Sequence, residues 1–213
     1  MPSPFDTGFV KICGVTTVKD AIFATSAGAS ALGLNLAVDS PRRISVESAR
    51  SVVTATEGAV WRCAIFRGRP DEEILEDLEG LGVEMVQLHD TLSVELLDAL
   101  RTRSLLVVKA LNIDGRDFEE FDERHVDAVL VDGPRPGSGV AHSWARLQER
   151  PFSVPVIAAG GLTPTNVAEV IASTTVVGVD SASGVEHVPG TKDHEAVTSF
   201  VTNARRAFAS REE

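Results

Sequence analysis

The sequence predicts an α/β fold, a single-domain (β/α)8 TIM barrel, on three observations. Short apolar runs occur eight times and alternate with segments that carry helix start signals. The runs are rich in Val, Ile and Leu on both faces, which is typical of parallel strands covered on both sides. The length suits one domain, residues 1–213 with a core of about 9–209. A doubly wound open sheet is the alternative, because a count of strands does not prove that the sheet closes.

The predicted strands recur along the whole chain. They are residues 9–13, 31–34, 61–66, 85–88, 105–110, 128–131, 154–159 and 176–179. In the first of them Phe9, Lys11 and Cys13 share one face, because the side chains of a strand alternate. We expect the tails 1–7 and 211–213 to lie outside the core.

Helix start signals follow most of the predicted strands. Thr17, with Asp20 three residues later, fits a capping box. Further candidate start residues are Ser45, Pro70, Thr163 before Pro164, and Asp193. They predict helices from about 46 to 56, from 71, from 164 and from 195 to 209. The segments 116–124 and 143–150 are weaker candidates, because the first is highly charged and the second is short.

Composition limits the classes of partner. The formal net charge of −11 argues against nucleic acid, because a nucleic-acid-binding protein needs a basic stripe. No apolar stretch approaches the ~20 residues that span a membrane. The N-terminus lacks the basic start and apolar run of a signal peptide, so we expect a cytoplasmic protein. Cys13, Cys63 and the scattered histidines have no metal-ligand spacing, which predicts neither a metal site nor a disulfide.

In a barrel of this kind the C-terminal ends of the strands carry the function. Polar and glycine residues gather at these ends: Cys13, Gln87, His89, Lys109, Asp132, Gly137, Ser138, Gly139, Gly160, Gly161, Asp180, Ser183 and Gly184. The glycines follow the last three strands, where backbone amides can approach a phosphate because glycine leaves room. The alternative is that tight turns simply require glycine.

Cys13 and Asp132 are the candidates for a base and an acid. Cys13 ends a predicted strand and Asp132 directly follows one, so both side chains would project into the mouth of the barrel. The alternatives are a buried small apolar residue for Cys13 and a turn-capping carboxylate for Asp132.

Three basic residues near the mouth need partners. Lys11 lies one inward step below Cys13, and we expect it to pair with Asp180 because strands one and eight are neighbours in a closed barrel. We expect Lys109 to point inward in a polar layer, with a Schiff-base lysine as the alternative. Arg42 can bind a carboxylate bidentately, or it can be solvated together with Arg43.

Several motifs in this order resemble the phosphoribosylanthranilate isomerases of tryptophan biosynthesis, from about residue 9 to 209. The motifs are Lys11-Ile-Cys-Gly14, Ser40-Pro-Arg42, Val86-Gln-Leu-His89, Val108-Lys-Ala110, Asp132 with Gly137-Ser-Gly139, Ala159-Gly-Gly-Leu-Thr-Pro164, and Ser183-Gly-Val-Glu186 with Pro189-Gly190 and Lys192-Asp193. The combination is more specific than any one of them.

The resemblance implies an Amadori rearrangement of N-(5′-phosphoribosyl)anthranilate to 1-(2-carboxyphenylamino)-1-deoxyribulose 5-phosphate. This is an aldose–ketose isomerisation, an intramolecular oxidoreduction that uses no cofactor and no metal. The resemblance implies Asp132 as general acid at the ring oxygen, Cys13 as general base at C2′, and Arg42 at the anthranilate carboxylate. The remaining implied binding residues are Lys11, Gln87, His89, Asp180 and the glycine loops, which hold the phosphate. The expected partner is an anionic sugar phosphate, and the expected state is a monomer or homodimer.

The chain departs from the family pattern at a few places. Residues 33–39 lack two usual aromatic residues, and Pro136 and His142-Ser143 replace other residues. Asp90 replaces a usual glycine, so we expect an extra negative charge near the mouth.

Two other function classes compete with this isomerase. A non-catalytic sugar-phosphate binder is disfavoured because Cys13 and Asp132 are both retained. Another phosphosugar barrel would need metal ligands, as in an epimerase, or more catalytic lysines and glutamates at strand ends, as in indole-glycerol-phosphate synthase.

Overall fold

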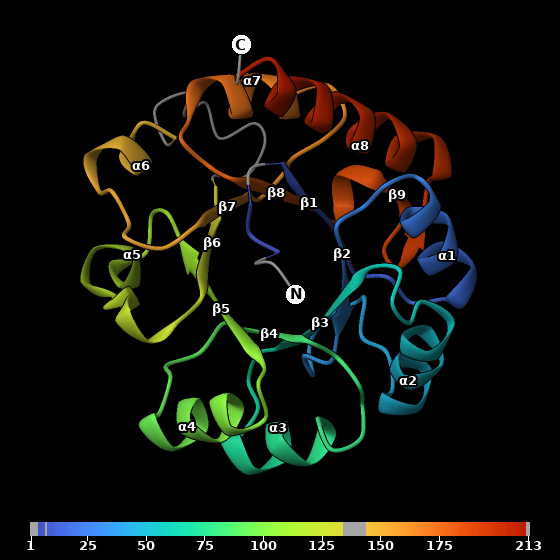
Figure 1. Cartoon of the computed structure of the whole chain (residues 1–213), viewed down its shortest axis with the longest axis vertical. Helices are drawn as coiled ribbons and strands as arrows, with labels where there is room; N and C mark the ends of the chain where they lie inside the picture. The colour runs from blue at the N-terminus through green and yellow to red at the C-terminus, as the bar shows by residue number, and fades with distance from the viewer. Residues whose placement is uncertain (1–3, 7, 134–143, 212–213) are drawn as a thin grey trace.

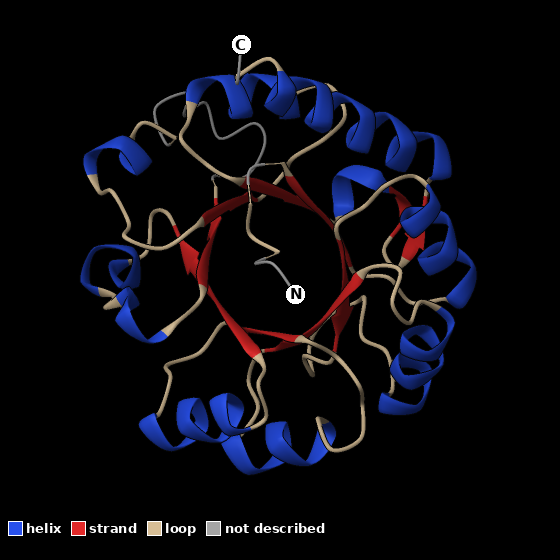
Figure 2. Cartoon of the chain, in the orientation of Figure 1, coloured by secondary structure: helices blue, strands red, loops and turns tan. Residues whose placement is uncertain are grey.

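A computed structural model describes residues 4–6, 8–133 and 144–211, and these form a ring of strands surrounded by helices (Figures 1 and 2). Eight parallel strands pair in the order of the sequence, and β8 pairs with β1 to close the barrel. The predicted (β/α)8 barrel is confirmed, and the open-sheet alternative is wrong.

The strands of the barrel are β1 (Phe9–Cys13), β2 (Ala31–Asn35), β3 (Trp61–Phe66), β4 (Met85–Leu88), β5 (Leu106–Asn112), β6 (Ala128–Asp132), β7 (Val156–Ala159) and β8 (Gly178–Ser181). Three of the predicted strands match in full, and the others differ by one or two residues at one or both ends. After β8 the chain adds a short hairpin that the sequence did not predict. It consists of β9 (Glu186–Val188) and β10 (Thr191–Lys192).

The helices are α1 (Val18–Ser26), α2 (Val46–Ala55), α3 (Asp71–Asp77), α4 (Val94–Thr102), α5 (Arg116–Glu120), α6 (Arg146–Glu149), α7 (Val167–Ser173) and α8 (His194–Ala209), with 3-10 turns η1 (Glu123–His125) and η2 (Ser183–Val185). Thr17, Ser45 and Asp193 cap their helices as predicted, since each side chain accepts a backbone N–H of the first turn. The predicted start at Thr163 is wrong. α7 begins later, with Asn166 at the N-cap position but without a side-chain cap bond, because its Oδ1 accepts the Thr163 N–H at 2.8 Å in the preceding turn.

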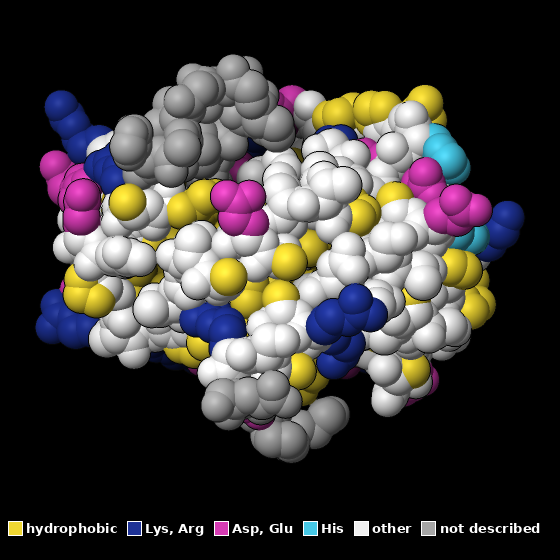
Figure 3. All heavy atoms as spheres, turned by 90° about the horizontal axis from the view of Figure 1, so that it is seen from above, with side chains coloured by type: hydrophobic (Ala, Val, Ile, Leu, Met, Phe, Trp, Pro, Cys, Tyr) yellow, Lys and Arg dark blue, Asp and Glu magenta, His cyan; other side chains and the backbone are white. Residues whose placement is uncertain are grey.

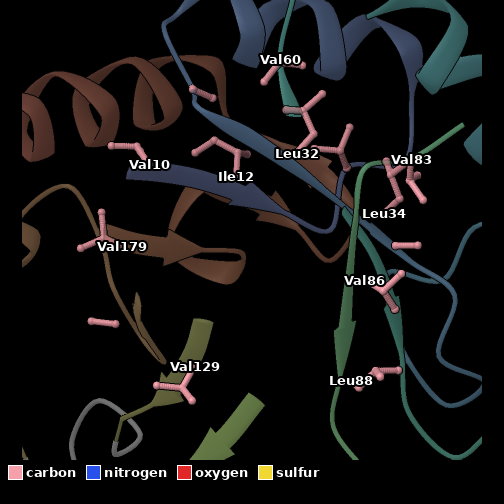
Figure 4. Close-up of a cluster of buried hydrophobic side chains, with 14 of the residues drawn as sticks. Val10, Ile12, Leu32, Leu34, Val60, Val83, Val86, Leu88, Val129 and Val179 are labelled. Carbon is pink, nitrogen blue, oxygen red and sulfur yellow. The ribbon is translucent and has the colours of Figure 1, made fainter. Parts of the chain in front are cut away.

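Side chains of the strands form two separate apolar layers. The inner layer fills the barrel with Phe9, Cys13, Ala31, Cys63, Ile65, Met85, Val108, Ala110, Ala128, Leu130, Ile157 and Ala159. The alternate side chains point outward toward the helices, and Figure 4 labels Val10, Ile12, Leu32, Leu34, Val86, Leu88, Val129 and Val179 among them. The alternation predicted for the first strand is therefore confirmed.

Residues 4–6 lie at one end of the barrel and at the centre of the ring in Figure 1. Phe5 is only 5% exposed, and its ring lies 5.5 Å from that of Phe9. Gly178 makes room for this pair, because a Cβ there would lie 2.9 Å from Phe9. The expectation that residues 1–7 lie outside the core is therefore wrong for Phe5.

The outer surface is mixed. On the face in Figure 3, acidic and basic side chains are scattered among uncharged ones, so the acidic excess does not gather there. None of the helices in the described ranges combines the length and the apolar character that crossing a bilayer requires.

Candidate active site

A cavity of about 900 Å³ opens at the C-terminal ends of the strands. Its wall includes these predicted site residues: Cys13, Arg42, Gln87, His89, Asp132, Gly160, Gly161, Asp180 and Ser183. Lys11 and Gly184 lie behind the wall rather than in it. Gly137, Ser138 and Gly139, like Pro136 and His142-Ser143, fall outside the described residues. We call this space the mouth cavity.

Cys13 ends β1 with its thiol in the inner layer of the barrel. The residue is 8% exposed, and Gly33 on β2 leaves room for it, because a Cβ there would lie 2.9 Å from Sγ. Burial raises the pKa of the Cys13 thiol, and the carboxylate of Asp180 acts in the same direction. Lys11 and Lys192 act in the opposite direction. The net shift is upward, so the thiol form predominates at neutral pH unless further positive charge arrives.

An ion pair lies directly below the thiol. Nζ of Lys11 and Oδ1 of Asp180 are 3.0 Å apart, and the two residues are register partners on β1 and β8. Burial lowers the pKa of Lys11, but the charge and hydrogen bond of Asp180, together with the negative charges that Cys13 and Cys63 carry when ionised, outweigh it, so the pKa is raised. The predicted pairing is confirmed, and Lys11 keeps its positive charge.

Asp132 ends β6 on another wall, with its side chain exposed. Gly160 on the neighbouring loop has φ +88°, a conformation that favours glycine. A Cβ at Gly160 would lie 2.6 Å from the backbone N of Gly133 and closer still to Oδ1 of Asp132. The glycine is therefore required to leave space for the carboxylate.

The loops after β7 and β8 are tied together. Oγ of Ser181 donates to the carbonyl oxygen of Leu162 at 2.7 Å, and a Cβ at Gly184 would collide with the same carbonyl group. Among the described residues, none accepts a hydrogen bond from the backbone N–H of Gly161 or Gly184. These N–H groups are available to an anion.

Arg42 reaches the wall of the mouth cavity from the loop after β2. Its Nε donates to both carboxylate oxygens of Glu186, at 3.0 and 2.9 Å, and its Nη2 donates to Oε2 at 2.8 Å. The alternative of a solvated arginine pair is therefore wrong for Arg42. Its Nη1 makes no hydrogen bond with the described part of the chain, so one edge of the guanidinium group can bind a ligand.

Gln87 and His89 form the β4 side of the mouth cavity. Burial lowers the pKa of His89 to about 4, and the charges of Arg67 and Lys109 act in the same direction. The imidazole is therefore neutral at pH 7. Nε2 of Gln87 lies 3.0 Å from Nε2 of His89, a geometry in which the amide donates to an unprotonated ring nitrogen.

One expectation about this end of the barrel is wrong. Lys109 points outward, because inward Val108 and Ala110 flank it on β5, and its Nζ donates to the carbonyl oxygens of His89 at 2.6 Å and Ala110 at 3.0 Å. Asp90 brings a negative charge near the mouth as expected, since it acts on the adjacent His89, but Asp90 itself is not in the wall of the mouth cavity and its Oδ2 accepts the Gly68 N–H at 2.6 Å. Lys109 and Asp90 instead line a second cavity of about 660 Å³ between α4 and α5.

Sequence reasoning missed several residues of the wall. Asn35, Arg67 and Asn112 line the mouth cavity, each two residues beyond an inward side chain or glycine of its strand. Extending the alternation past each apolar run would have found them. Within the described ranges, no three His, Cys, Asp or Glu side chains are grouped so as to hold a metal ion.

Comparisons with known proteins converge on one family. The model of the family described as N-(5′phosphoribosyl)anthranilate (PRA) isomerase matches residues 10–203. An N-(5′-phosphoribosyl)anthranilate isomerase from Haloarcula marismortui is 36% identical over 207 residues, which cover 93% of this chain and 96% of that relative. The crystal structure of phosphoribosyl anthranilate isomerase from Thermotoga maritima superposes with a TM-score of 0.84 at 34% identity, covering 93% of this chain and 98% of that one.

A further similar solved structure is that of phosphoribosyl anthranilate isomerase in complex with reduced 1-(o-carboxyphenylamino)-1-deoxyribulose 5-phosphate. The similarity gives a TM-score of 0.78 at 34% identity, covering 93% of this chain and 98% of that one.

Proposed function

Because the chain belongs to the N-(5′-phosphoribosyl)anthranilate isomerase family and is an isomerase, we propose that it converts N-(5′-phosphoribosyl)anthranilate to 1-(2-carboxyphenylamino)-1-deoxyribulose 5-phosphate in tryptophan biosynthesis. One observation carries the proposal for this chain. A thiol and a carboxylate enter a single cavity from different walls, together with an arginine edge and the backbone N–H of Gly161, which donates no hydrogen bond to the described residues. The substrate is anionic at both ends, and its isomerisation needs one acid and one base.

Asp132 is the proposed general acid. It protonates the ribose ring oxygen, which opens the ring and leaves a Schiff base between C1′ and the anthranilate nitrogen. Its exposed place at the end of β6, where Gly160 leaves space for the carboxylate, lets the carboxyl group reach a bound sugar. The negative charges of the substrate favour the protonated form of a nearby carboxyl group.

Cys13 is the proposed general base. As thiolate it removes the C2′ proton from the Schiff base, which gives an enolamine that becomes the ketose when C1′ is protonated and the 2′-hydroxyl loses its proton. The positive charges of Lys11 and Lys192 favour the thiolate. A thiolate is far more basic than a neutral thiol, so their contribution decides how much active base is present.

The two anionic ends of the substrate need separate binding groups. Nη1 of Arg42 is proposed to pair with the anthranilate carboxylate, and the N–H groups of Gly161 and Gly184 with the phosphate, helped by Ser183. Gly137, Ser138 and Gly139 are proposed as a further wall of the phosphate site. Gln87 and His89 are proposed to contact the sugar. Lys11 and Asp180 are proposed to act on the site from their place below Cys13.

A coupled assay with freshly made phosphoribosylanthranilate tests the function directly. Added indole-glycerol-phosphate synthase should convert the product as it forms, so that turnover is observed without any metal or cofactor bound to this protein. Binding of the substrate without turnover would instead indicate a non-catalytic sugar-phosphate binder.

The phosphate site has its own test. Gly161→Asp places a negative charge in the proposed site and should weaken the binding of inorganic phosphate measured by calorimetry. Gly58→Asp is the matched control, because Gly58 also has positive φ and has nothing within 4 Å of a Cβ. Unchanged affinity in Gly161→Asp would place the phosphate elsewhere.

A further inference from the structure

The chemistry proposed above draws only on the charge of Lys192 from the β9–β10 hairpin, yet the hairpin also makes contacts on both sides of the base. Lys192 is 3% exposed. Its Nζ donates to the carbonyl oxygen of Cys13 at 2.5 Å, to Oε1 of Glu186 at 2.8 Å and to the carbonyl oxygen of Ala182 at 3.4 Å. An ammonium group has three protons, so Lys192 is fully engaged and links the end of β1 to the hairpin.

Glu186 connects the same hairpin to the arginine of the mouth cavity. Its side chain is 3% exposed and accepts three hydrogen bonds from Arg42 and one from Lys192. The backbone N–H of Gly190 also donates to Oε1 at 3.2 Å. This carboxylate therefore fixes the guanidinium group of Arg42 from behind and leaves its Nη1 edge toward the cavity.

Two further contacts join the hairpin and Arg42 to the residues that follow the base. Oγ1 of Thr16 donates to the carbonyl oxygen of Gly190 at 2.5 Å, which places the hairpin beside the start of α1 (Figure 1). The side chain of Arg42 packs on Gly14, since a Cβ at Gly14 would lie 2.5 Å from Cδ of Arg42. A two-stranded hairpin is marginally stable alone, so these contacts hold it in place.

The charges around Cys13 come from several elements. They are Lys11 on β1, Asp180 on β8, Lys192 on β10, Arg42 in the loop after β2, Glu186 on β9 and, when ionised, Cys63 on β3. Burial raises the pKa of Cys63 to about 12, so that thiol stays neutral. Three cations and two anions remain, and a Cys13 thiolate would bring the network to neutrality.

We propose that the hairpin is a clamp in which Glu186 and Lys192 are positioning residues for the isomerisation. Lys192 fixes the backbone of Cys13 and supplies positive charge to its thiolate. Glu186 fixes the guanidinium group of Arg42, so that the base and the carboxylate-binding arginine keep a constant separation. The proposal rests on the function proposed above.

The arm that involves Lys192 can be tested without any assay of turnover. The rate of alkylation of Cys13 by iodoacetamide is measured against pH, with peptide mass spectrometry to separate Cys13 from Cys63. Lys192→Met should move the midpoint to higher pH by roughly one unit, the lower end of shifts caused by a nearby charge. Lys19→Met, on the exposed face of α1, is the matched control and should leave the midpoint unchanged.

Two more variants keep this test decisive if Lys192→Met does not fold. Lys192→Gln retains hydrogen-bond donors without the charge and should also move the midpoint upward. Lys192→Arg retains the charge, so the midpoint for alkylation of Cys13 should stay at its wild-type pH. An unchanged midpoint in Lys192→Met or Lys192→Gln overturns this arm of the proposal, whether or not the protein has isomerase activity.

The arm that involves Glu186 is tested by steady-state kinetics. Glu186→Gln should raise KM at least tenfold and lower kcat, because a displaced arginine orients the substrate poorly. In an Arg42→Ala background the same change should add little to KM, because the two residues act through one contact. Glu169→Gln, exposed on α7, is the control.

The two proposals fail in different ways. An active wild-type enzyme with an unchanged or lower KM in Glu186→Gln would overturn the clamp and leave the function intact. An inactive wild-type protein that still shows the alkylation shift in Lys192→Met would contradict the function and support the Lys192 arm.

Discussion

Cys13 and Asp132 reach the same cavity from walls that are built in different ways. Cys13 is buried on β1, above the ion pair of Lys11 with Asp180 and beside the ammonium group of Lys192. Asp132 ends β6 with its side chain exposed next to glycine. The wall of β1 is thus a network of buried charges, whereas the wall of β6 is a strand end that small residues keep open.

This difference shows how one cavity can hold both a base and an acid. Burial raises the pKa of the Cys13 thiol, so surrounding cations have to favour the thiolate. Asp132 depends instead on its place at the end of β6, because its carboxyl group has to come within hydrogen-bond reach of the ring oxygen. We expect changes near Cys13 to alter the pH dependence, and changes near Asp132 to alter the rate alone.

The largest effects should come from replacing the two groups themselves. Cys13→Ser supplies a far weaker base, and Asp132→Asn cannot donate an acidic proton. Each should lower kcat by roughly 10²–10⁴, the usual worth of a general acid or base. Cys13→Ser should also destabilise the protein more than Asp132→Asn, because only Cys13 is buried. The coupled assay and thermal unfolding measure both, and a folded variant with near-native kcat would exclude that residue as catalyst.

The second-largest effect should come from displacing the carboxylate of Asp132. Gly160→Ala forces the Asp132 carboxylate aside and should lower kcat on the order of 10²-fold, the cost of a displacement of about 1 Å. Gly58→Ala has the same backbone strain, about 1–2 kcal/mol, but meets no neighbour, so its kcat should be that of the wild type. Equal kcat values for the two variants would show that Asp132 does not depend on this space.

Replacing Arg42, which is proposed to bind the carboxylate of the substrate, should have a smaller effect than either of these changes. Loss of a charge-assisted hydrogen bond costs about 1.5–3 kcal/mol, so Arg42→Ala should weaken substrate binding by that free energy and raise KM correspondingly. Arg43→Ala is the matched control, because Arg43 is exposed and does not line the mouth cavity. A larger KM increase in Arg43→Ala would reverse the assignment.

The smallest effect is a shift in pH dependence. With the pKa of Cys13 raised, kcat/KM should increase as pH rises above neutrality, because the thiolate fraction increases. Asp180→Asn removes a charge that raises this pKa and leaves Lys11 free to favour the thiolate, so the increase should begin at lower pH. Asp98→Asn, exposed on α4, should leave the profile where it is. A shift to higher pH in Asp180→Asn would contradict the arrangement of charges.

The buried pair below the base could be predicted from the sequence. Alternation puts Lys11 on the inner face, and closure of the barrel makes β8 its neighbour, so Asp180 follows as partner. The strands were predicted well because an apolar run marks where a strand lies, and the alternation of its side chains indicates which of them face the inside of the barrel. The prediction for Lys109 is wrong because its polar character suggested an inner polar layer, whereas alternation with inward Val108 and Ala110 puts its side chain on the outer face.

The clamp and the burial of Phe5 at the other end of the barrel could not be predicted in this way. Arg42 and Glu186 are 144 residues apart, and the strands of the hairpin are too short to show a pattern. Phe5 is a single aromatic residue among turn residues, with no periodicity to mark it as buried. Such long-range side-chain contacts follow from the closed barrel and are invisible in local sequence.

The most direct measurement is the primary kinetic isotope effect on kcat with substrate deuterated at C2′ of the ribose. In Cys13→Ser, removal of the C2′ proton becomes slower, so the isotope effect should exceed that of the wild type. In Asp132→Asn, ring opening becomes slow and breaks no bond to C2′ hydrogen, so the isotope effect should fall toward unity. Equal isotope effects in the two variants, or a larger one in Asp132→Asn, would contradict the assignment of Cys13 as base and Asp132 as acid.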